Sequence, residues 1–348
     1  MLKVCKFGGT SLKDANSFLI VKNIVKGDMF RKIVVVSAPG KRFKGDYKVT
    51  DLLLSYYNDQ QNLRVKRQIK QRFIDIVNGL NIDIDLKKEF EKIFDVKGKS
   101  RDYVVSRGEY LTAKIMAKIL NFKFIDAENI LHFKGDKINV KKGINLAKKI
   151  DYNCGIVVPG FYGKKGKNIK LFCRGGSDLT GSYLARFYKA EIYENFTDIC
   201  GISMINPNLN LPLKFIKNLS FNDFKNLKGL NPSVLQKSAY KPIKRTNCSI
   251  FIKNTFNING NFTRIKRKLK IKKPTIFSIS YNNNLLIVTG RKLTKKDGLL
   301  KRVKAILKDK NIKFKVVKKR TNVLMFLVKN YSELYMVKLM YFKLVLNR

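Results

Sequence analysis

The sequence predicts an α/β fold in which a mainly parallel sheet is covered by helices on both faces. Strand and helix signals alternate through about the first 200 residues. Two short apolar runs each end in paired glycines, Gly8-Gly9 and Gly175-Gly176. Such alternation is typical of parallel strands joined by helices, with ligands bound at the carboxyl ends of the strands.

The first predicted strand, Val4 to Phe7, runs into Gly8-Gly9-Thr10-Ser11. A second version of this turn is Arg174-Gly175-Gly176-Ser177-Asp178. Glycine lets backbone N–H groups approach an anion, and a hydroxyl or carboxylate residue can cap the helix that follows. The two turns therefore predict two walls of one phosphate pocket, which carry Lys6 on one side and Arg174 with Asp178 on the other.

The next elements extend the same pattern. Residues 33–36 form a β-branched run that ends at Ser37, and residues 155–158 form another run before Pro159. Leu111, Ile115 and Ile119 have helical spacing. We expect the loops after Gly8, Ser37 and Gly175 to meet at one edge of the sheet.

The last third of the chain has a different, β-rich pattern. A basic stretch, Thr263 to Pro274, is expected to be a linker or partly the last strand of the first domain. The elements expected beyond it are strands within 275–289 with a hairpin at 282–284, a helix at 297–309, strands near 313–318 and 323–328, and a helix near 331–346. This order predicts a small α+β domain.

The charge of the chain is extreme but evenly spread. Among 348 residues, 73 are Lys or Arg and 25 are Asp or Glu, which gives a net charge of +48. Lysines occur throughout the chain and not in one segment, so we expect no specific nucleic-acid partner. The apolar segment Leu334 to Leu346 is short and interrupted by Lys338 and Lys343, so no membrane span is expected.

Cysteine and histidine offer no metal site. The five cysteines contain no Cys-x-x-Cys pair, and Cys5 and Cys173 lie in apolar, strand-like runs. Reduced core cysteines are typical of a cytoplasmic protein. The single histidine, His132, is expected to pack and not to bind a metal.

The sequence Lys6 to Ser11 resembles the opening of aspartate kinases, members of the amino-acid-kinase superfamily. The resemblance continues in the family's order over about the first 265 residues. The blocks that carry it are Ser37-Ala38-Pro39-Gly40, Lys48-Val49-Thr50-Asp51-Leu52, Ser106-Arg107-Gly108-Glu109, Val158-Pro159-Gly160-Phe161, Arg174 to Asp178, Thr197-Asp198-Ile199 and Ile252 to Asn257.

The resemblance implies an architecture. It implies an amino-acid-kinase-like three-layer sandwich with a mainly parallel central sheet at 1–265, a basic linker at 266–273, and a single or truncated ACT-like regulatory domain at 274–348. Aspartate kinases usually carry two ACT modules, and this chain has room for one. Because such modules resemble sensors that pair between subunits, a homodimer is expected.

The resemblance also implies a reaction. Aspartate kinases transfer the γ-phosphoryl group of ATP, with Mg²⁺ carried by the nucleotide, to the side-chain carboxylate of L-aspartate. The product, 4-phospho-L-aspartate, begins lysine, threonine and methionine synthesis. A carboxylate is already ionised at neutral pH, so the site needs positioning and charge neutralisation but no general base.

The implied catalytic residues are Lys6, which would contact the transferring phosphoryl group, and Asp178, which would organise the nucleotide and nearby cations. Arg174 would hold the α-carboxylate of aspartate and Glu109 its amino group. The other implied aspartate-site residues are Ser37, Thr50 and Ser177. The implied nucleotide and phosphate residues are Lys6, Gly8, Gly9, Thr10, Ser11, Gly175, Gly176, Thr197, Asp198 and Ser203.

The nucleotide side departs from the family pattern. Where the family commonly has Tyr and then Asp-Pro-Arg, this chain has Ser203 and then Asn206-Pro207-Asn208. Where it has Lys-Val-Leu-His-Pro, this chain reads Ser233 to Lys237. The favoured interpretation is an active aspartate kinase with altered nucleotide contacts. The alternatives are a catalytically weak aspartate-binding regulatory relative with a degraded ATP site, another amino-acid or carbamate kinase on this fold, and a basic nucleic-acid-binding protein.

Overall fold

The computed structural model describes residues 1–172, 175–227, 235, 238–270, 273–294 and 298–347. The chain forms two compact units. The first contains Met1–Cys200 and Ser238–Gly260, and the second contains Gly201–Lys237 and Asn261–Arg348. The chain therefore leaves the first unit at Cys200, returns at Ser238 and leaves again at Gly260.

The main sheet of the first unit has strand order β11-β9-β1-β2-β6-β3. All five pairings within it are parallel, as predicted. The strands of the first unit are β1 (Lys3–Phe7), β2 (Arg31–Val36), β3 (Lys123–Phe124), β4 (Phe133–Lys134), β5 (Lys137–Ile138), β6 (Ile156–Pro159), β7 (Tyr162–Lys165), β8 (Asn168–Leu171), β9 (Ile192–Thr197) and β11 (Ser249–Asn254). Two antiparallel pairs, β4 with β5 and β7 with β8, lie outside the main sheet.

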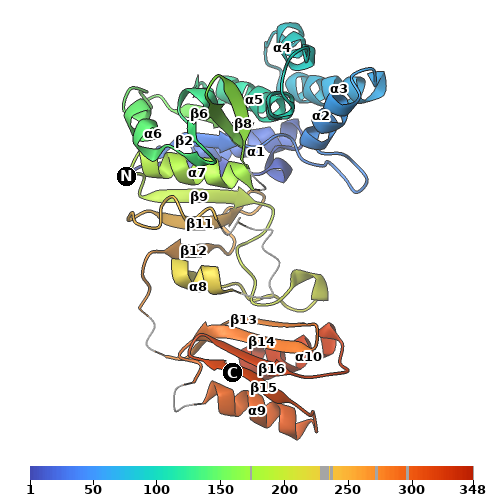
Figure 1. Ribbon diagram of the computed structural model, residues 1–348, viewed down its shortest axis with the longest axis vertical. Helices are drawn as coiled ribbons and strands as arrows, with labels where there is room; N and C mark the ends of the chain where they lie inside the picture. The colour runs from blue at the N-terminus through green and yellow to red at the C-terminus, as the bar shows by residue number, and fades with distance from the viewer. Residues whose placement is uncertain (173–174, 228–234, 236–237, 271–272, 295–297, 348) are drawn as a thin grey trace. The chain divides into compact units, whose positions relative to one another are not determined.

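Five helices of the first unit, α1 and α3 to α6, begin at side chains that accept hydrogen bonds from the first turn. Asp14, Asn62 and Ser100 cap three of them in this way. The helices are α1 (Ala15–Lys26), α2 (Val49–Asn58), α3 (Leu63–Leu80), α4 (Leu86–Phe94), α5 (Arg101–Leu120), α6 (Val140–Ala147) and α7 (Gly176–Phe187). Figure 1 shows α2, α3 and α4 gathered at one end of this unit.

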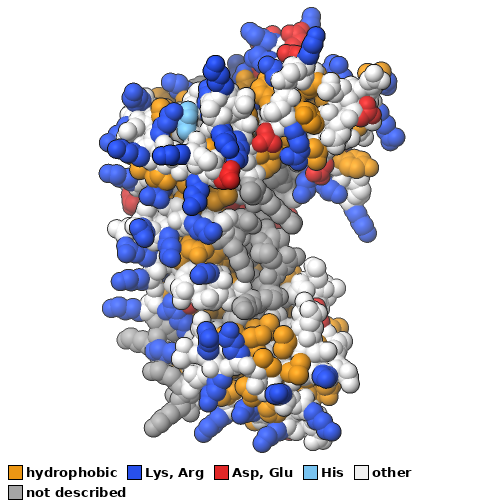
Figure 2. All heavy atoms as spheres, in the orientation of Figure 1, with side chains coloured by type: hydrophobic (Ala, Val, Ile, Leu, Met, Phe, Trp, Pro, Cys, Tyr) orange, Lys and Arg blue, Asp and Glu red, His pale blue; other side chains and the backbone are white. Residues whose placement is uncertain are grey.

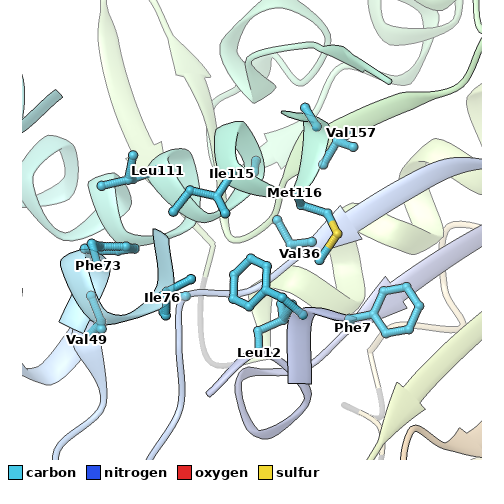
Figure 3. Packing of buried hydrophobic residues seen from close by; sticks show 14 of the residues in the cluster. Phe7, Leu12, Val36, Val49, Phe73, Ile76, Leu111, Ile115, Met116 and Val157 are labelled. Atoms are coloured by element: carbon cyan, nitrogen blue, oxygen red, sulfur yellow. The ribbon is translucent and has the colours of Figure 1, made fainter. Parts of the chain in front are cut away.

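Alternating side chains of the sheet face two helical layers. Cys5 and Phe7 of β1 pack into one large core together with residues of α1 to α5, and Figure 3 shows Phe7 and Leu12 in this core. The opposite face is covered by α7, which contacts β1, β2 and β9. Helix, sheet and helix thus make three layers, and Lys6, between Cys5 and Phe7, faces α7.

The second unit contains an antiparallel sheet of order β13-β14-β16-β15. Helices α9 and α10 pack into the same core as this sheet. Its elements are β10 (Asn218–Ser220), α8 (Phe221–Asn226), β12 (Thr263–Lys266), β13 (Thr275–Asn282), β14 (Leu285–Arg291), α9 (Leu299–Asp309), β15 (Lys315–Arg320), β16 (Val323–Leu327) and α10 (Glu333–Tyr341), which ends in a π-helical turn at Phe342–Leu346. The predicted small α+β domain is confirmed, and the hairpin turns on Asn283 and Asn284, which both have positive φ.

Some local expectations were wrong. We expected a hydroxyl or carboxylate residue after each glycine pair to cap a helix. After Gly8-Gly9 the chain instead makes a 3-10 turn, Gly9–Leu12, and Asp14 caps α1. Helix α7 begins at Gly176 without a side-chain cap, because the capping position is Gly175, which has no side chain and adopts φ +77°. The basic stretch was expected to be a linker or partly a strand, and its first residues do form a strand, β12, which pairs with β10.

The surface agrees with the spread of lysine along the sequence. Figure 2 shows Lys and Arg side chains over the visible face of both units, with Asp and Glu far fewer. Among the described residues, no helix combines the length and the apolarity needed to cross a bilayer.

Candidate functional site

Parallel register brings the strand ends of the first unit to one edge. Phe7 of β1 pairs with Val36 of β2 and with Phe196 of β9, and Val36 pairs with Pro159 of β6. The loops that follow these strands therefore start side by side. Two further backbone bonds extend this register beyond the strand ends. The Ser37 N–H donates to the Phe7 carbonyl at 3.1 Å. The Gly8 N–H donates to the Phe196 carbonyl at 3.2 Å.

Two glycines let two of these loops touch. The Gly40 N–H donates to the Gly9 carbonyl at 2.8 Å. A Cβ on Gly40 would lie 2.6 Å from the carbonyl carbon of Gly9, and a Cβ on Gly9 would lie 2.9 Å from the Ala38 carbonyl oxygen. Both contacts are with backbone atoms that cannot move aside, so only glycine fits at either position.

Lys6 and Asp178 meet above this edge. The Lys6 Nζ lies 2.7 Å from Asp178 Oδ1, and both side chains are about nine-tenths buried at 11% exposure. A Cβ on Gly8 would lie 3.5 Å from the same ammonium. The structure thus brings together the two predicted catalytic residues and the predicted phosphate turn. A buried cation beside a glycine turn, held by a carboxylate in the first turn of α7, is suited to a phosphoryl group.

Ser177 belongs to the same cluster. It is buried, and a Cβ on Gly160 would lie 2.6 Å from its hydroxyl oxygen. Ser177 therefore lies directly against the loop after β6. Its neighbours Gly175 and Gly176 form the tight start of α7.

Glu109 is a buried acid without full compensation. It is 3% exposed on α5, and its Oε2 has no hydrogen-bond partner within the described parts of the chain. Burial raises the pKa of Glu109 to about 8, although a hydrogen bond with the Ala38 backbone and the charge of Arg107 act in the opposite direction. A buried carboxylate oxygen of this kind is suited to an incoming ammonium group.

Helix α5 lies directly under the loop after β2. A Cβ on Gly108 would meet the Cβ of Ala38 at 2.9 Å and the Val49 side chain at 3.2 Å. Glu109 is therefore held next to the segment that carries Ser37 and Thr50. Ser37 is half-buried, and Thr50 is a half-buried residue in the first turn of α2.

The remaining predicted residues differ in their surroundings. Thr10 is exposed, whereas Ser11 is fully buried and its hydroxyl hydrogen-bonds that of Thr255 at 2.7 Å. Thr197 ends β9, and its hydroxyl donates to the Asp198 carboxylate at 3.1 Å. Arg174 lies outside the described residues.

Ser203 belongs to the second unit. It is buried, and its hydroxyl donates to the Ile205 carbonyl at 2.5 Å. Its segment is joined to the core of that unit by a bond from the Ile279 N–H to the Met204 carbonyl at 2.9 Å. The hydroxyl of Ser203 is thus committed to its own backbone.

Two features at the edge had no signal in the residue pattern. Phe161 has φ +78°, a strained conformation for a bulky residue, and its N–H donates to the Thr180 hydroxyl at 3.1 Å. Arg72 of α3 is buried and reaches the loop after β2. A positive φ on phenylalanine and the burial of one arginine of a basic helix both depend on contacts distant in sequence.

Comparison with known proteins agrees with this geometry. The model of the amino acid kinase family matches residues 1–254. Aspartokinase 3 of Bacillus subtilis is 33% identical over 293 residues, which cover 77% of this chain and 64% of the relative. The chain thus spans less than two thirds of the length of that relative.

Solved structures give the same result. The aspartate kinase of Clostridium acetobutylicum superposes with a TM-score of 0.76 at 35% identity, over 94% of this chain and 77% of that one. Aspartokinase III of E. coli shares the fold, with a TM-score of 0.71 at 22% identity over 98% of this chain and 83% of that one. With the three-layer fold and the edge described above, these similarities show that the chain belongs to the amino acid kinase family, among relatives that are aspartate kinases.

Proposed function

We propose that this chain is an aspartate kinase, which transfers the γ-phosphoryl group of ATP to the side-chain carboxylate of L-aspartate. The observation that carries the proposal is the buried Oε2 of Glu109, which no described residue hydrogen-bonds and which is held beside the edge at which Lys6 and Asp178 meet. Ala38 links the two, because its backbone bonds Glu109 and its carbonyl contacts Gly9. A carboxylate for an ammonium, next to a cation for a phosphoryl group, suits an amino-acid substrate.

The relatives support the same substrate. The similar proteins from B. subtilis and C. acetobutylicum are an aspartokinase and an aspartate kinase. The E. coli structure of the same fold is a complex with aspartate and ADP. The product would be 4-phospho-L-aspartate, at the head of lysine, threonine and methionine synthesis.

Lys6 carries the main charge in the proposed mechanism. The aspartate carboxylate is ionised at neutral pH and attacks without losing a proton. Lys6 faces the transferring phosphoryl group and offsets the charge on its oxygens, while Asp178 holds the ammonium in place from α7. Backbone N–H groups of the Gly8 to Ser11 turn add further donors.

The aspartate is oriented through its backbone groups. Glu109 holds the substrate ammonium, and we assign the α-carboxylate to Arg174, whose guanidinium suits a bidentate contact. Ser37, Thr50 and Ser177 line the rest of the substrate site. Held in this way, the side-chain carboxylate points at the phosphoryl group.

Magnesium enters with the nucleotide. Among the described residues no group of three or more His, Cys, Asp or Glu side chains could hold a metal ion, whereas one carboxylate, that of Asp178, lies at the phosphate edge. This fits Mg²⁺, which is commonly held by one or two carboxylates together with substrate phosphates. When bound, the ion neutralises charge on the phosphate oxygens.

The adenosine side is expected to bind with fewer contacts than is common in the family. The position expected to hold a tyrosine is Ser203, and its hydroxyl is used within its own segment. Asn208 and Ser233 stand where the family commonly has Arg and Lys, and each charged hydrogen bond lost in this way lowers affinity by about 10- to 100-fold. We therefore expect a high KM for ATP, with Thr197 and Asp198 as the remaining contacts at the end of β9.

We extend the proposal to assembly and compartment. The four-stranded sheet with α9 and α10 is the ACT-like module through which a homodimer would form. Cys5 and Cys248 are buried free thiols, consistent with a reducing cytoplasm. Light scattering on the purified protein would measure the subunit number.

The reaction is tested by trapping the acyl phosphate. Protein, Mg-ATP and L-aspartate are incubated with hydroxylamine, and the hydroxamate is quantified for the wild type and Asp178→Asn. We expect product from the wild type and a loss of at least about 100-fold in the variant, because Lys6 loses its partner. Folded wild-type protein that binds aspartate but yields no hydroxamate would refute the proposal in favour of a binding relative.

A further inference from the structure

Arg72 reaches two ends of one loop. It lies on α3 and is 3% exposed. One guanidinium nitrogen, Nη1, donates to the Gly40 carbonyl at 2.8 Å. The other, Nη2, lies 2.6 Å from Asp46 Oδ2 and 3.3 Å from the Tyr47 carbonyl. A single side chain therefore fixes both ends of the segment from Gly40 to Tyr47.

This segment connects two proposed substrate residues. It joins Ser37, after β2, to Thr50, at the start of α2, and residues 41–45 between them are exposed. The loop has no strand or helix of its own. Its geometry thus depends on the few bonds that close it. Arg72 of α3 supplies three of them, to Gly40, Asp46 and Tyr47.

Gly40 connects Arg72 to the turn from Gly8 to Ser11. Its carbonyl accepts from Arg72, and its N–H donates to the Gly9 carbonyl at 2.8 Å. The turn from Gly8 to Ser11, here the phosphate wall, and the loop after β2, here the substrate wall, face each other at this point. Arg72 lies behind the substrate wall. Through Gly40, it sets the distance between the substrate wall and the phosphate wall.

The buried ion pair between Arg72 and Asp46 is not explained by stability alone, because burying charged groups costs free energy. Burial lowers the pKa of the Arg72 guanidinium, and its Nε has no partner within the described parts of the chain. Buried ion pairs are often no better for stability than apolar side chains of the same size. Asp46 is the compensating charge, and its pKa falls to about 2 because bonds from Arg42 and the backbone, with the charge of Arg72, outweigh the effect of burial.

We propose that Arg72 is a positioning residue, which holds the loop after β2 against the Gly8 to Ser11 turn and so fixes the substrate and phosphate walls relative to each other. The part that concerns phosphoryl transfer rests on the proposed aspartate kinase activity. Arg72 touches neither substrate in this scheme. It acts through Gly40.

Arg42 offers a matched control. Its N–H and Nε bond the same Asp46 at 2.9 Å and 3.0 Å, yet within the described parts of the chain it makes no hydrogen bond to Gly40, and its side chain is 36% exposed. Arg42→Met removes a charge, the side-chain bond to Asp46 and an exposed bond to Asp75 of α3 at 3.4 Å, while the bond from Arg72 to Gly40 remains. Arg72→Lys keeps the charge but cannot span Gly40, Asp46 and Tyr47 at once.

The kinetic arm compares these variants in the hydroxamate assay, well below their melting temperatures. We expect Arg72→Lys to lower kcat/KM for aspartate about 10- to 100-fold, since a displacement of about 1 Å has effects of this size. Arg42→Met should stay within about threefold of wild type. Arg72→Ala should regain activity with millimolar guanidinium, because a cavity of about 140 Å³ lined by Arg42, Gln68, Gln71 and Arg72 lies beside the vacated site.

The exchange arm needs no activity. In hydrogen–deuterium exchange, Arg72→Lys should speed exchange of peptides covering both 8–12 and 37–47, and Arg42→Met should affect only 41–47. Unchanged exchange at 8–12 in folded Arg72→Lys overturns the proposal, as does a kcat/KM within twofold of an active wild type. An inactive wild type with the expected exchange pattern would refute the proposed function and leave the positioning role in place.

Discussion

Glu109 is the residue whose chemistry depends most on what binds beside it. With a pKa of about 8, its carboxyl group is mostly protonated at neutral pH in the free protein. A substrate ammonium stabilises the ionised form, so binding must drive a proton off this group. Aspartate binding is therefore coupled to proton release.

This coupling predicts a pH-dependent affinity. Between pH 6 and pH 8 the affinity for aspartate should rise by up to about tenfold per pH unit, because the ionised fraction of Glu109 rises at that rate. Titration calorimetry in two buffers of different ionisation enthalpy would measure the protons released. Glu109→Gln should bind weakly at every pH and release no proton from this position, and an affinity independent of pH in the wild type would contradict the assignment.

The same shift affects stability in the opposite direction. Because the folded pKa of Glu109 is raised, its contribution to stability is present in full below about pH 4.5 and is lost as the pH rises through about 8. The unliganded wild type should thus lose more thermal stability than Glu109→Gln between pH 6 and pH 8.

At the scale of elements, one carboxylate joins the strands beneath the site. Glu194 of β9 bonds Arg31 of β2 at 2.7 Å and Lys253 of β11 at 2.6 Å, and it accepts from the Cys5 thiol of β1 at 3.3 Å. Burial alone would raise its pKa, but the two cations lower it to about 2. Four strands that end at the site are thereby linked at one point.

Removing this charge should weaken the whole sheet. Glu194→Gln removes the buried carboxylate that bonds Arg31 and Lys253, and we expect a loss of about 3–5 kcal/mol in the free energy of unfolding, measured in urea at pH 7. The depressed pKa means that the contribution is present above about pH 4.5 and is lost as the pH falls towards 2. The control is Glu191→Gln, directly before β9 and 62% exposed, which should change stability by less than about 0.5 kcal/mol.

The same elements show what sequence can and cannot predict. The β-branched run before Ser37 and the pattern from 275 onward predict their strands, because hydrophobic period is a local property. Glu109 could be assigned to the site from its block, but not its raised pKa, which depends on burial. Arg72 and Glu194 carried no signal, since their partners lie 25 or more residues away in sequence.

At the scale of the whole molecule, the second unit takes part of its core from the middle of the chain. Ile205 is fully buried in the core that contains α9 and α10. Arg291 of β14 bonds Asp223 of α8 at 2.7 Å and the Ser220 hydroxyl at 2.8 Å. The resemblance predicts a domain boundary near 265, and this division stays a prediction. The chain itself passes from one compact unit to the other three times.

This arrangement predicts the outcome of a truncation. A protein ending at Lys270 would keep Gly201–Lys237 but lose the sheet and helices that cover it. It should bind a hydrophobic dye and elute as an aggregate in size exclusion, while the full chain does neither. A monodisperse, dye-free product that still forms hydroxamate would show that the middle segment needs no cover.

The interleaved chain also sets an order of events during synthesis. The Lys214 N–H donates to the Tyr341 hydroxyl, 127 residues later, at 2.8 Å. A ribosome that adds about 5–20 residues per second needs roughly 6–25 s to reach Tyr341 after it has added Lys214. During that time the apolar side chains around Ile205 stay exposed, because the rest of their core has not yet been translated. This is the interval in which a chaperone would bind the nascent chain.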